Sequence, residues 1–523
     1  MPHPNLHYYQ PTNERKDRTI DCDICVYGAT SGGVIAAIHA AQQGKRVALL
    51  AFGTKVGGLS AGGLGCTDYG KKDMYGGLAM EFYRRMGAIK GEAASWYFEA
   101  SVAERVYEEW LKEAKVPVYR RQALASAEKE GGRLRSIRCE DGSVYRAEIF
   151  IDASYEGDLM ALAGVSWVAG RESSAQFGEV YNGRHFGHPN HNFHLFVDPY
   201  REEGRPSSGL LQGISDEDPG MQGEGDDCIQ AYNFRVCLSR DPENQLPFPQ
   251  PDNYDPERYT LLARYLKVGV WDALQLTSWV TKTKSDTNNW GGFSSDNIGA
   301  NHRWPDASYA EREIMFQDHV TYNQGLYWFL RNDPRVPEFI REELGLSGLP
   351  ADEFTETGGW PHELYVREAR RMVSDVVVTE HDCVGAMKAH DPVALATYHM
   401  DSHNCRRIVF GRRAYNEGNV EIMVPRPFPI SYRAIVPRRA ECENLLVPWC
   451  LSASHIAFGS IRMEPVFMTL GQASAEAAIM AIDRQQAVQD IDYPTLRERL
   501  LSSGGLLDYP VGDGFVIKRG ACS

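Results

Sequence analysis

The hydrophobic pattern near the start of the chain predicts a strand, a turn, a helix and a second strand. Residues 23–27 alternate and are rich in strand-forming types, 34–43 carry apolar residues at helical spacing, and 46–50 form a short apolar run. Gly44 follows the helix, where a left-handed residue is favoured. This order is typical of a unit in which two parallel strands flank one helix.

The chain then enters a glycine-rich stretch at 56–70, which predicts a long loop rather than a helix or strand. Apolar residues at four-residue spacing between 102 and 114 predict a helix. The next expected strands span 118–127, 132–139, 143–147 and 148–153. Together these elements predict one nucleotide-binding domain of the α/β class.

Beyond about residue 170 the regular pattern breaks down. Residues 171–310 are rich in Pro, Gly, Asn and Asp, which predicts an irregular, loop-heavy region. Helical periodicity returns at 308–332 and at 363–373. Near the end of the chain, 444–450 predicts a buried strand and 464–484 predicts a helix rich in small residues. A chain of 523 residues is expected to form at least two domains.

The turn between the first strand and the first helix reads GATSGG. It is a variant of the Gly-x-Gly-x-x-Gly dinucleotide fingerprint, with Thr30 in the place of the middle glycine. Gly28 would permit the tight turn, and Gly33 would permit close packing of the helix on the strand. The N–H groups and partial positive charge at the helix start would bind a pyrophosphate. The expected cofactor contacts are Gly28, Thr30, Ser31, Gly32 and Gly33.

The second strand lacks a residue that dinucleotide sites normally carry. An acid near its end usually binds the adenosine ribose, but this strand ends in Leu50, Ala51 and Phe52. Thr54 and Lys55 are nearby polar residues that could replace the acid. The sequence does not choose between them.

FAD rather than NAD is indicated by the glycine-rich loop directly after this strand, because such a loop suits close approach of the backbone to a long, flat cofactor. The predicted strands at 118–147 are also the usual insertion of two-dinucleotide flavoprotein folds. The cofactor contacts expected from the loop are Gly58, Leu59, Ser60, Gly62 and Gly63.

The chain contains four distinctive segments: KVGGLSAGGLGCTDYG, IDASYEGDLMALAGV, WPHELYVREARRMV and NLLVPWCLSASHIAFGSIRMEPVFMTLGQASAEAAIMA. They resemble the bacterial FAD-dependent oxidoreductases often labelled xanthan lyase-like, within the glutathione-reductase-type FAD fold. The resemblance implies that the C-terminal segment folds back to complete the FAD domain. It implies that Ile461, Arg462 and Met463 lie by the flavin or its ribityl chain. It also implies that Gly471 and Gln472 begin the helical part that faces the ring.

The predicted fold is therefore an α/β, Rossmann-like FAD-binding domain built from both chain ends, with an inserted α+β substrate domain. The expected boundaries are an N-terminal arm at 1–20, a first FAD-domain part at 21–168, the substrate domain at 169–439, a second FAD-domain part at 440–490 and a C-terminal tail at 491–523. No second fingerprint follows, so NAD(P)H is not the expected electron donor. Hydride is expected to come from a small organic substrate, with oxygen, a quinone or a protein as acceptor.

Removal of hydride from a C–H(OH) carbon needs a base for the hydroxyl proton, and histidine suits that role near neutral pH. His455 is the first candidate, because its segment is expected at the flavin. His403 is the second, with Asp401 as an orienting partner. Both have structural alternatives: His455 could bond a pyrophosphate or a loop carbonyl, and residues 401–403 could form a turn.

Four residues are candidates for binding a polar substrate such as a sugar or glycoside. Arg367 and Arg370 fall in the predicted helix at 363–373, while Lys284 and Asn288 fall in a polar loop. Ion pairs with nearby glutamates are the structural alternative for the arginines. The alternative functions are a flavin-assisted lyase or isomerase without net redox change, and a non-catalytic flavin-binding protein.

Composition narrows the expected partners. Lys and Arg total 55 against 70 for Asp and Glu, giving a formal charge of −15 that disfavours nucleic acid and anionic lipid. We find no apolar run near the ~20 residues of a membrane span and no secretory signal, so a cytoplasmic location is expected. The 11 cysteines are odd in number and scattered, which fits reduced thiols better than a disulfide framework, and no metal site is expected. Homo-oligomerisation is left open.

Overall fold

The computed structural model describes residues 3–12, 14–272 and 278–509. It contains a five-stranded parallel sheet in the order β20-β8-β2-β3-β4. These strands are β2 (Ile24–Tyr27), β3 (Val47–Leu50), β4 (Val118–Tyr119), β8 (Ile149–Asp152) and β20 (Leu445–Leu446). Every residue of β2, β3 and β8 is buried, as expected for parallel strands covered on both faces. The predicted strand–turn–helix–strand unit is present.

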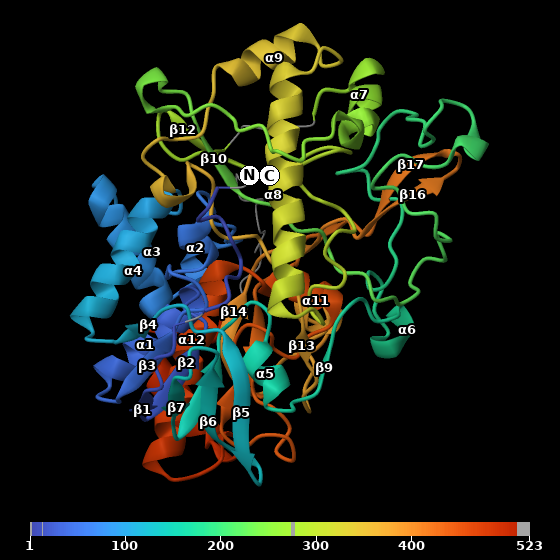
Figure 1. Cartoon of the computed structure of the whole chain (residues 1–523). Helices are drawn as coiled ribbons and strands as arrows, with labels where there is room; N and C mark the ends of the chain where they lie inside the picture. The colour runs from blue at the N-terminus through green and yellow to red at the C-terminus, as the bar shows by residue number, and fades with distance from the viewer. Residues whose placement is uncertain (1–2, 13, 273–277, 510–523) are drawn as a thin grey trace.

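Two helices from opposite ends of the chain pack against each other on this sheet. They are α1 (Ser31–Gln42) and α12 (Glu464–Asp483). Figure 1 shows the red α12 among the blue α1, β2 and β3. Their contact is very close, since a Cβ added at Gly471 would lie only 2.1 Å from the carbonyl oxygen of Gly32. The C-terminal segment therefore lies directly behind the fingerprint turn.

By length and composition, α12 could also cross a membrane, contrary to our expectation that the chain holds no such stretch. Its apolar window has a mean hydropathy of 1.2, and 94% of that window is buried inside the structure. Its apolar residues pack against α1 and the sheet, as in the core helix of a folded domain.

A second sheet, in the order β1-β7-β6-β5, lies beside the first. It consists of β1 (Thr19–Asp21), β5 (Leu124–Glu130), β6 (Arg133–Cys139) and β7 (Val144–Arg146). The single strand expected at 118–127 is wrong, because its two halves belong to different sheets. Arg121 has a φ of 57°, and this left-handed residue turns the chain between β4 and β5.

The remaining helices of the N-terminal part are α2 (Leu59–Gly62), α3 (Gly77–Lys90), α4 (Ala100–Glu113) and α5 (Asp158–Leu162). Of these, α4 was predicted and α3 was missed. The glycine-rich stretch at 56–70, expected to be entirely loop, contains the single turn α2. A residue outside the loop stabilises that turn, since the Leu59 N–H donates to the Tyr155 hydroxyl at 2.7 Å.

The middle of the chain is irregular, as predicted, around the 24-residue helix α8 (Tyr309–Asn332), which Figure 1 shows standing upright in yellow. A capping box of Ser308 and Glu311 begins this helix. A three-stranded antiparallel sheet contains β10 (Val236–Ser239), β12 (Lys284–Thr287) and β11 (Ser278–Trp279). The two-stranded pairs are β9 (Trp167–Val168) with β13 (Arg371–Met372), β14 (Pro392–Ala396) with β19 (Phe428–Ser431), β15 (Met400–Ser402) with β18 (Val420–Ile422), and β16 (Arg406–Phe410) with β17 (Arg413–Glu417). The short helices here and near the C-terminus are α6 (Ser174–Phe177), α7 (Thr260–Lys267), α9 (Glu338–Gly345), α10 (Glu380–Cys383), α11 (His455–Ile461) and α13 (Tyr493–Ser502).

The helix predicted at 363–373 is wrong, because this segment is extended and ends in strand β13. Its backbone bonds to distant segments instead of forming the bonds of a helix. The Tyr365 N–H donates to the Asn233 carbonyl, and the Met372 N–H donates to the Cys450 carbonyl, both at 2.9 Å. Tertiary hydrogen bonds thus override the local helical pattern.

Candidate functional site

A cavity of about 580 Å³ lies where α1 begins. Its lining includes the fingerprint turn at 28–30 and the chain after β3, at 51–55. It also includes Gly58 and Ala61 of the second glycine-rich loop, several residues of the N-terminal arm, and the segment 362–364 with Val366. The cavity thus lies at the carboxyl ends of parallel strands, where α/β sheets bind their ligands.

The fingerprint turn lines this cavity with Gly28, Ala29 and Thr30. The Thr30 hydroxyl donates to the Ala153 carbonyl at 2.8 Å and accepts from the Gly33 N–H at 3.3 Å. Its side chain is therefore bonded to the segment after β8, which explains how threonine replaces the usual middle glycine. Ser31 and Gly32, which begin α1, are buried and do not themselves line the cavity. Their expected contacts with a pyrophosphate stay predictions.

The turn has no room for a side chain at Gly33. A Cβ there would lie 1.9 Å from the Gly28 carbonyl oxygen and 3.1 Å from the Ala153 Cβ. Gly28 itself has a φ of 97°, a conformation that glycine adopts readily. Both ends of the fingerprint therefore require glycine, for backbone reasons that the sequence pattern predicted.

Of the five residues predicted from the second glycine-rich loop, Gly58 lines the cavity. Ser60 points inward and donates to Glu464 at 3.3 Å, while Leu59 is buried. A Cβ at Gly62 would lie 2.2 Å from the Glu363 Cβ, and one at Gly63 would lie 2.5 Å from the Arg235 carbonyl. Gly62 and Gly63 thus let neighbouring segments approach the loop closely.

The C-terminal residues implied by the resemblance do not line this cavity. Ile461 and Met463 are buried, and Arg462 pairs with Asp401 at 2.9 Å. Gly471 contacts Gly32 from the far side of α1. Gln472 accepts a hydrogen bond from the Leu78 N–H at 2.8 Å and lies within α12 rather than at its start. Their expected cofactor contacts stay predictions.

Glu464, a residue that sequence reasoning missed, connects the C-terminal segment to the cavity wall. It accepts hydrogen bonds from Ser31, from Tyr155 at 3.1 Å and from Ser60 at 3.3 Å. Burial raises the pKa of Glu464 to about 7. Its position in the first turn of α12, directly before a proline, was the available signal, since acidic residues and proline favour helix starts.

Two of the acidic residues that line the cavity, Glu156 and Glu363, have raised pKa values. Burial, followed by the nearby carboxylates Glu156 and Glu464, raises the pKa of Glu363 to about 8. Burial also raises the pKa of Glu156 to about 7, although Arg312 opposes the shift. An anionic ligand in this cavity would favour the protonated form of both groups.

A buried polar cluster lies behind one wall of the cavity. Its members include Asp296, Tyr365, Arg367, Asp401, His403 and Arg462. His362, Glu363, Leu364 and Val366 line the cavity, whereas Tyr365 and its neighbour Arg367 contact the cluster instead. The Tyr365 hydroxyl accepts from Arg462 at 2.8 Å, and Arg367 pairs with Asp296 at 3.1 Å. From Leu364 to Arg367 this alternation follows from the extended backbone, in which successive side chains point to opposite sides.

His403 belongs to this cluster. Its Nδ1 lies 2.7 Å from the Asp296 carboxylate, while its Nε2 is 3.9 Å from Asp401. The expected orienting partner was Asp401, but Asp296 is the closer carboxylate and makes the hydrogen bond. Burial, followed by the positive charge of Arg367, lowers the pKa of His403 to about 4. The ring is therefore neutral at neutral pH, and among the described residues its Nε2 has no hydrogen-bond partner.

His455, the other predicted base, begins α11 and is only 2% exposed. Its Nδ1 lies 2.8 Å from Glu368 and its Nε2 lies 3.0 Å from the Ser402 hydroxyl. Burial, followed by the charge of Arg371, lowers its pKa to about 3. Both ring nitrogens are thus bonded to protein groups, and His455 does not line the cavity.

The predicted substrate arginines and Asn288 also have protein partners. Arg370 is buried and pairs with Asp158 at 2.6 Å, so it and Arg367 do not present the helical surface we expected. Asn288 is half-buried, and its side chain accepts from the Asn289 N–H at 2.9 Å. The structure does not bring these residues and Lys284 together into one site.

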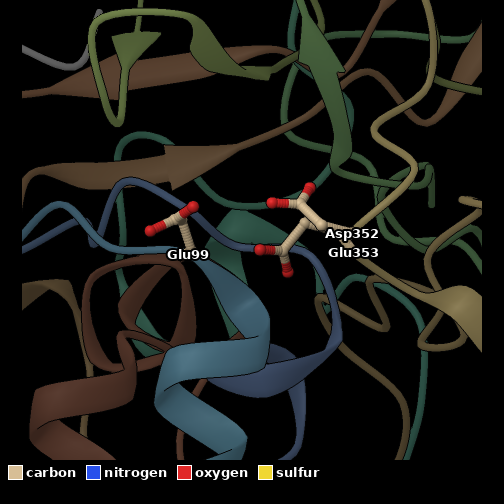
Figure 2. A group of neighbouring side chains, drawn as sticks. All are labelled: Glu99, Asp352 and Glu353. Atoms are coloured by element: carbon tan, nitrogen blue, oxygen red, sulfur yellow. The ribbon is translucent and has the colours of Figure 1, made fainter. Parts of the chain in front are cut away.

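Lys284 lies instead among three carboxylates, Glu99, Asp352 and Glu353. Figure 2 shows these acidic side chains grouped together, and their oxygens lie within 4.8 Å of one another. The Lys284 ammonium is 2.6 Å from Glu99, 2.6 Å from Asp352 and 3.2 Å from Glu353. It lies within ion-pair distance of all three carboxylates and offsets part of their negative charge.

Replacing Lys284 with methionine should lower the free energy of unfolding by about 3–5 kcal/mol, because it leaves buried carboxylate charge unpaired. Urea denaturation measures the change. Lys45→Met is the matched control, since it breaks a surface ion pair with Asp483 that should contribute at most about 1 kcal/mol. Equal losses in the two variants would contradict a special role for Lys284.

Comparison with solved structures finds partial similarities. A flavin monooxygenase from Stenotrophomonas maltophilia is 17% identical over 25% of this chain and 37% of its own, with a TM-score of 0.20. Thioredoxin reductase from T. acidophilum is 22% identical over 25% of this chain and 34% of its own, with a TM-score of 0.17. OTEMO, solved in complex with FAD and NADP, is 20% identical over 25% of each chain, with a TM-score of 0.21. The matched part spans less than half the length of each of these proteins.

A search of curated proteins finds no match. A family model described as FAD dependent oxidoreductase matches residues 23–500, which is most of the chain. That range begins at β2 and includes the fingerprint turn, the second glycine-rich loop and α12. This chain therefore belongs to the family of FAD-dependent oxidoreductases, and its cofactor is FAD.

Proposed function

We propose that this enzyme removes hydride from a C–H(OH) carbon of a small polar substrate, such as a sugar or glycoside. Bound FAD would supply the two-electron acceptor, and oxygen, a quinone or a protein would then receive the electrons. The observation that carries the proposal is the buried polar cluster behind the cavity wall, where a neutral histidine and several arginines meet. The narrower xanthan lyase-like resemblance stays a prediction.

His403 is the group best placed to accept the hydroxyl proton. Asp296 holds its Nδ1, which orients the ring and leaves Nε2 for a substrate. The depressed pKa keeps this nitrogen unprotonated at neutral pH. His455 then serves as a positioning residue, because its Nε2 bonds to Ser402, which ends β15 and directly precedes His403.

Three arginines supply charge for binding a polyhydroxylated or anionic substrate. Among the described residues, Arg235 Nη1, Arg367 Nε and Arg462 Nε are buried without a hydrogen-bond partner. Leaving such donors unpaired is costly, so a polar ligand at this cluster would be bound favourably. Of these, Arg367 was predicted to bind substrate, and Arg462 was predicted to contact the cofactor.

An anaerobic panel of sugars and polyols tests the proposed reaction. An oxidase or dehydrogenase substrate should bleach the flavin. A lyase or isomerase substrate should be converted while the flavin ends oxidised. If the panel neither reduces the flavin nor is converted, the non-catalytic alternative is favoured and sugar oxidation is rejected.

NADH and NADPH should reduce the bound flavin poorly. Among the described residues, the sheet at the fingerprint is the only one in which all strands are parallel. We therefore find no second nucleotide-binding unit there. Anaerobic mixing with micromolar NADPH measures this. Rapid bleaching would instead identify a nicotinamide as the electron donor.

A further inference from the structure

The N-terminal arm precedes the region that the family model matches, which begins at residue 23, yet it lines the cavity. The residues that do so include His7, Tyr8, Tyr9, Gln10, Pro11 and Thr12. They share this cavity with the fingerprint turn and with 51–55, the chain directly after β3. The arm therefore shares the cavity with the fingerprint turn, although it lies outside the region that the family model matches.

The arm meets the chain after β3 where the ribose-binding acid is missing. Phe52 stands in this region, and its ring centroid lies 4.8 Å from that of Tyr8 and 5.0 Å from that of Tyr309. Tyr9 completes the group at 6.4 Å from Phe52. An aromatic cluster thus stands where other dinucleotide sites place a carboxylate.

Specific hydrogen bonds hold the arm in place. Leu6 is fully buried and its carbonyl accepts from Gln317 at 2.8 Å. Glu313 accepts from the Tyr9 N–H at 2.8 Å, and the Tyr9 hydroxyl donates to Glu140 at 2.8 Å. The arm is thereby fixed between α8 and the turn that joins β6 to β7.

We propose that this arm binds the adenosine half of FAD. The pyrophosphate would lie at the start of α1, and the adenosine of a Rossmann-like unit lies toward the end of the second strand, which is β3 here. Tyr8 and Phe52 present aromatic surface to adenine, since bases stack favourably on such rings. Gln10 and Thr12 supply polar groups in place of the missing acid.

Titration of the apoprotein with FAD and with FMN tests the proposal, because FMN lacks adenosine. Tyr8→Leu, and a chain lacking residues 1–12, should each bind FAD about 10- to 100-fold more weakly. Both should bind FMN within about twofold of the wild type. Arg15→Ala is the matched control, since this exposed residue does not line the cavity and should leave both affinities unchanged.

Unchanged FAD binding in both arm variants would overturn the proposal. Equal losses for FAD and FMN would also overturn it, because the arm would then act only on the fold. If the shortened chain does not fold, proteolysis of the wild type provides a separate readout. ADP and FAD should slow chymotrypsin cleavage after Tyr8 and Tyr9, whereas FMN should not. Equal cleavage with and without ADP would contradict adenosine binding by the arm.

Discussion

Gly33→Val should yield a folded protein that is purified without its yellow cofactor. The added Cβ would lie 1.9 Å from the Gly28 carbonyl oxygen, so the turn must open and α1 must move away from the strand. The turn residues Gly28, Ala29 and Thr30, which line the cavity, would then be displaced. We expect a loss of at least about 3 kcal/mol in FAD binding, or about 100-fold in Kd.

Titration of the apoprotein, followed by visible absorbance, measures this loss, and circular dichroism checks the fold. Gly44→Asn is the matched control at the other end of α1. Gly44 has a φ of 83° and open space around it, and asparagine tolerates that conformation. A Gly33→Val protein with full FAD occupancy would show that the cofactor does not bind at this turn.

His403→Gln should retain FAD and slow flavin reduction by about 10²- to 10⁴-fold, which is the usual contribution of a positioned base. The measurement is anaerobic single-turnover reduction with a substrate from the sugar and polyol panel. His455→Gln is the matched variant, and we expect it to slow the reaction less and to lower stability, because it breaks buried bonds to Glu368 and Ser402. If the larger rate loss belongs to His455→Gln, then His455 is the base, as the sequence alone suggested.

The pH dependence of flavin reduction also tests whether His403 is the base. A base must be unprotonated, so activity falls as pH drops through its pKa. Since the pKa of His403 is lowered to about 4, the reduction rate should stay level down to about pH 5 and fall only below that. A fall centred near the unperturbed histidine value of about 6.5 would contradict His403 as the base.

Part of this site could be predicted because the residues that form it are consecutive in the sequence. The strand β2, the GATSGG turn, α1 and β3 follow one another, so hydrophobic periodicity and glycine placement predicted them together. The cofactor followed from this unit and from the second glycine-rich loop. The helix α8 was predicted for the same reason, since its apolar pattern is local.

The tertiary structure alone decided which distant groups meet. The segment 363–373 has a helical pattern, but its N–H groups find acceptors on other segments, and its arginines bury their charge against Asp296 and Asp158. Asp296 is 107 positions from His403, so no local pattern could pair them. The contact between Tyr8 of the N-terminal arm and Phe52 likewise joins segments that are distant in the sequence. By itself, the sequence determined the strand–turn–helix unit and its ligand class, because backbone geometry there depends on neighbouring residues. Charge pairing and the adenosine end of the cavity depend on contacts between segments that only the folded chain brings together.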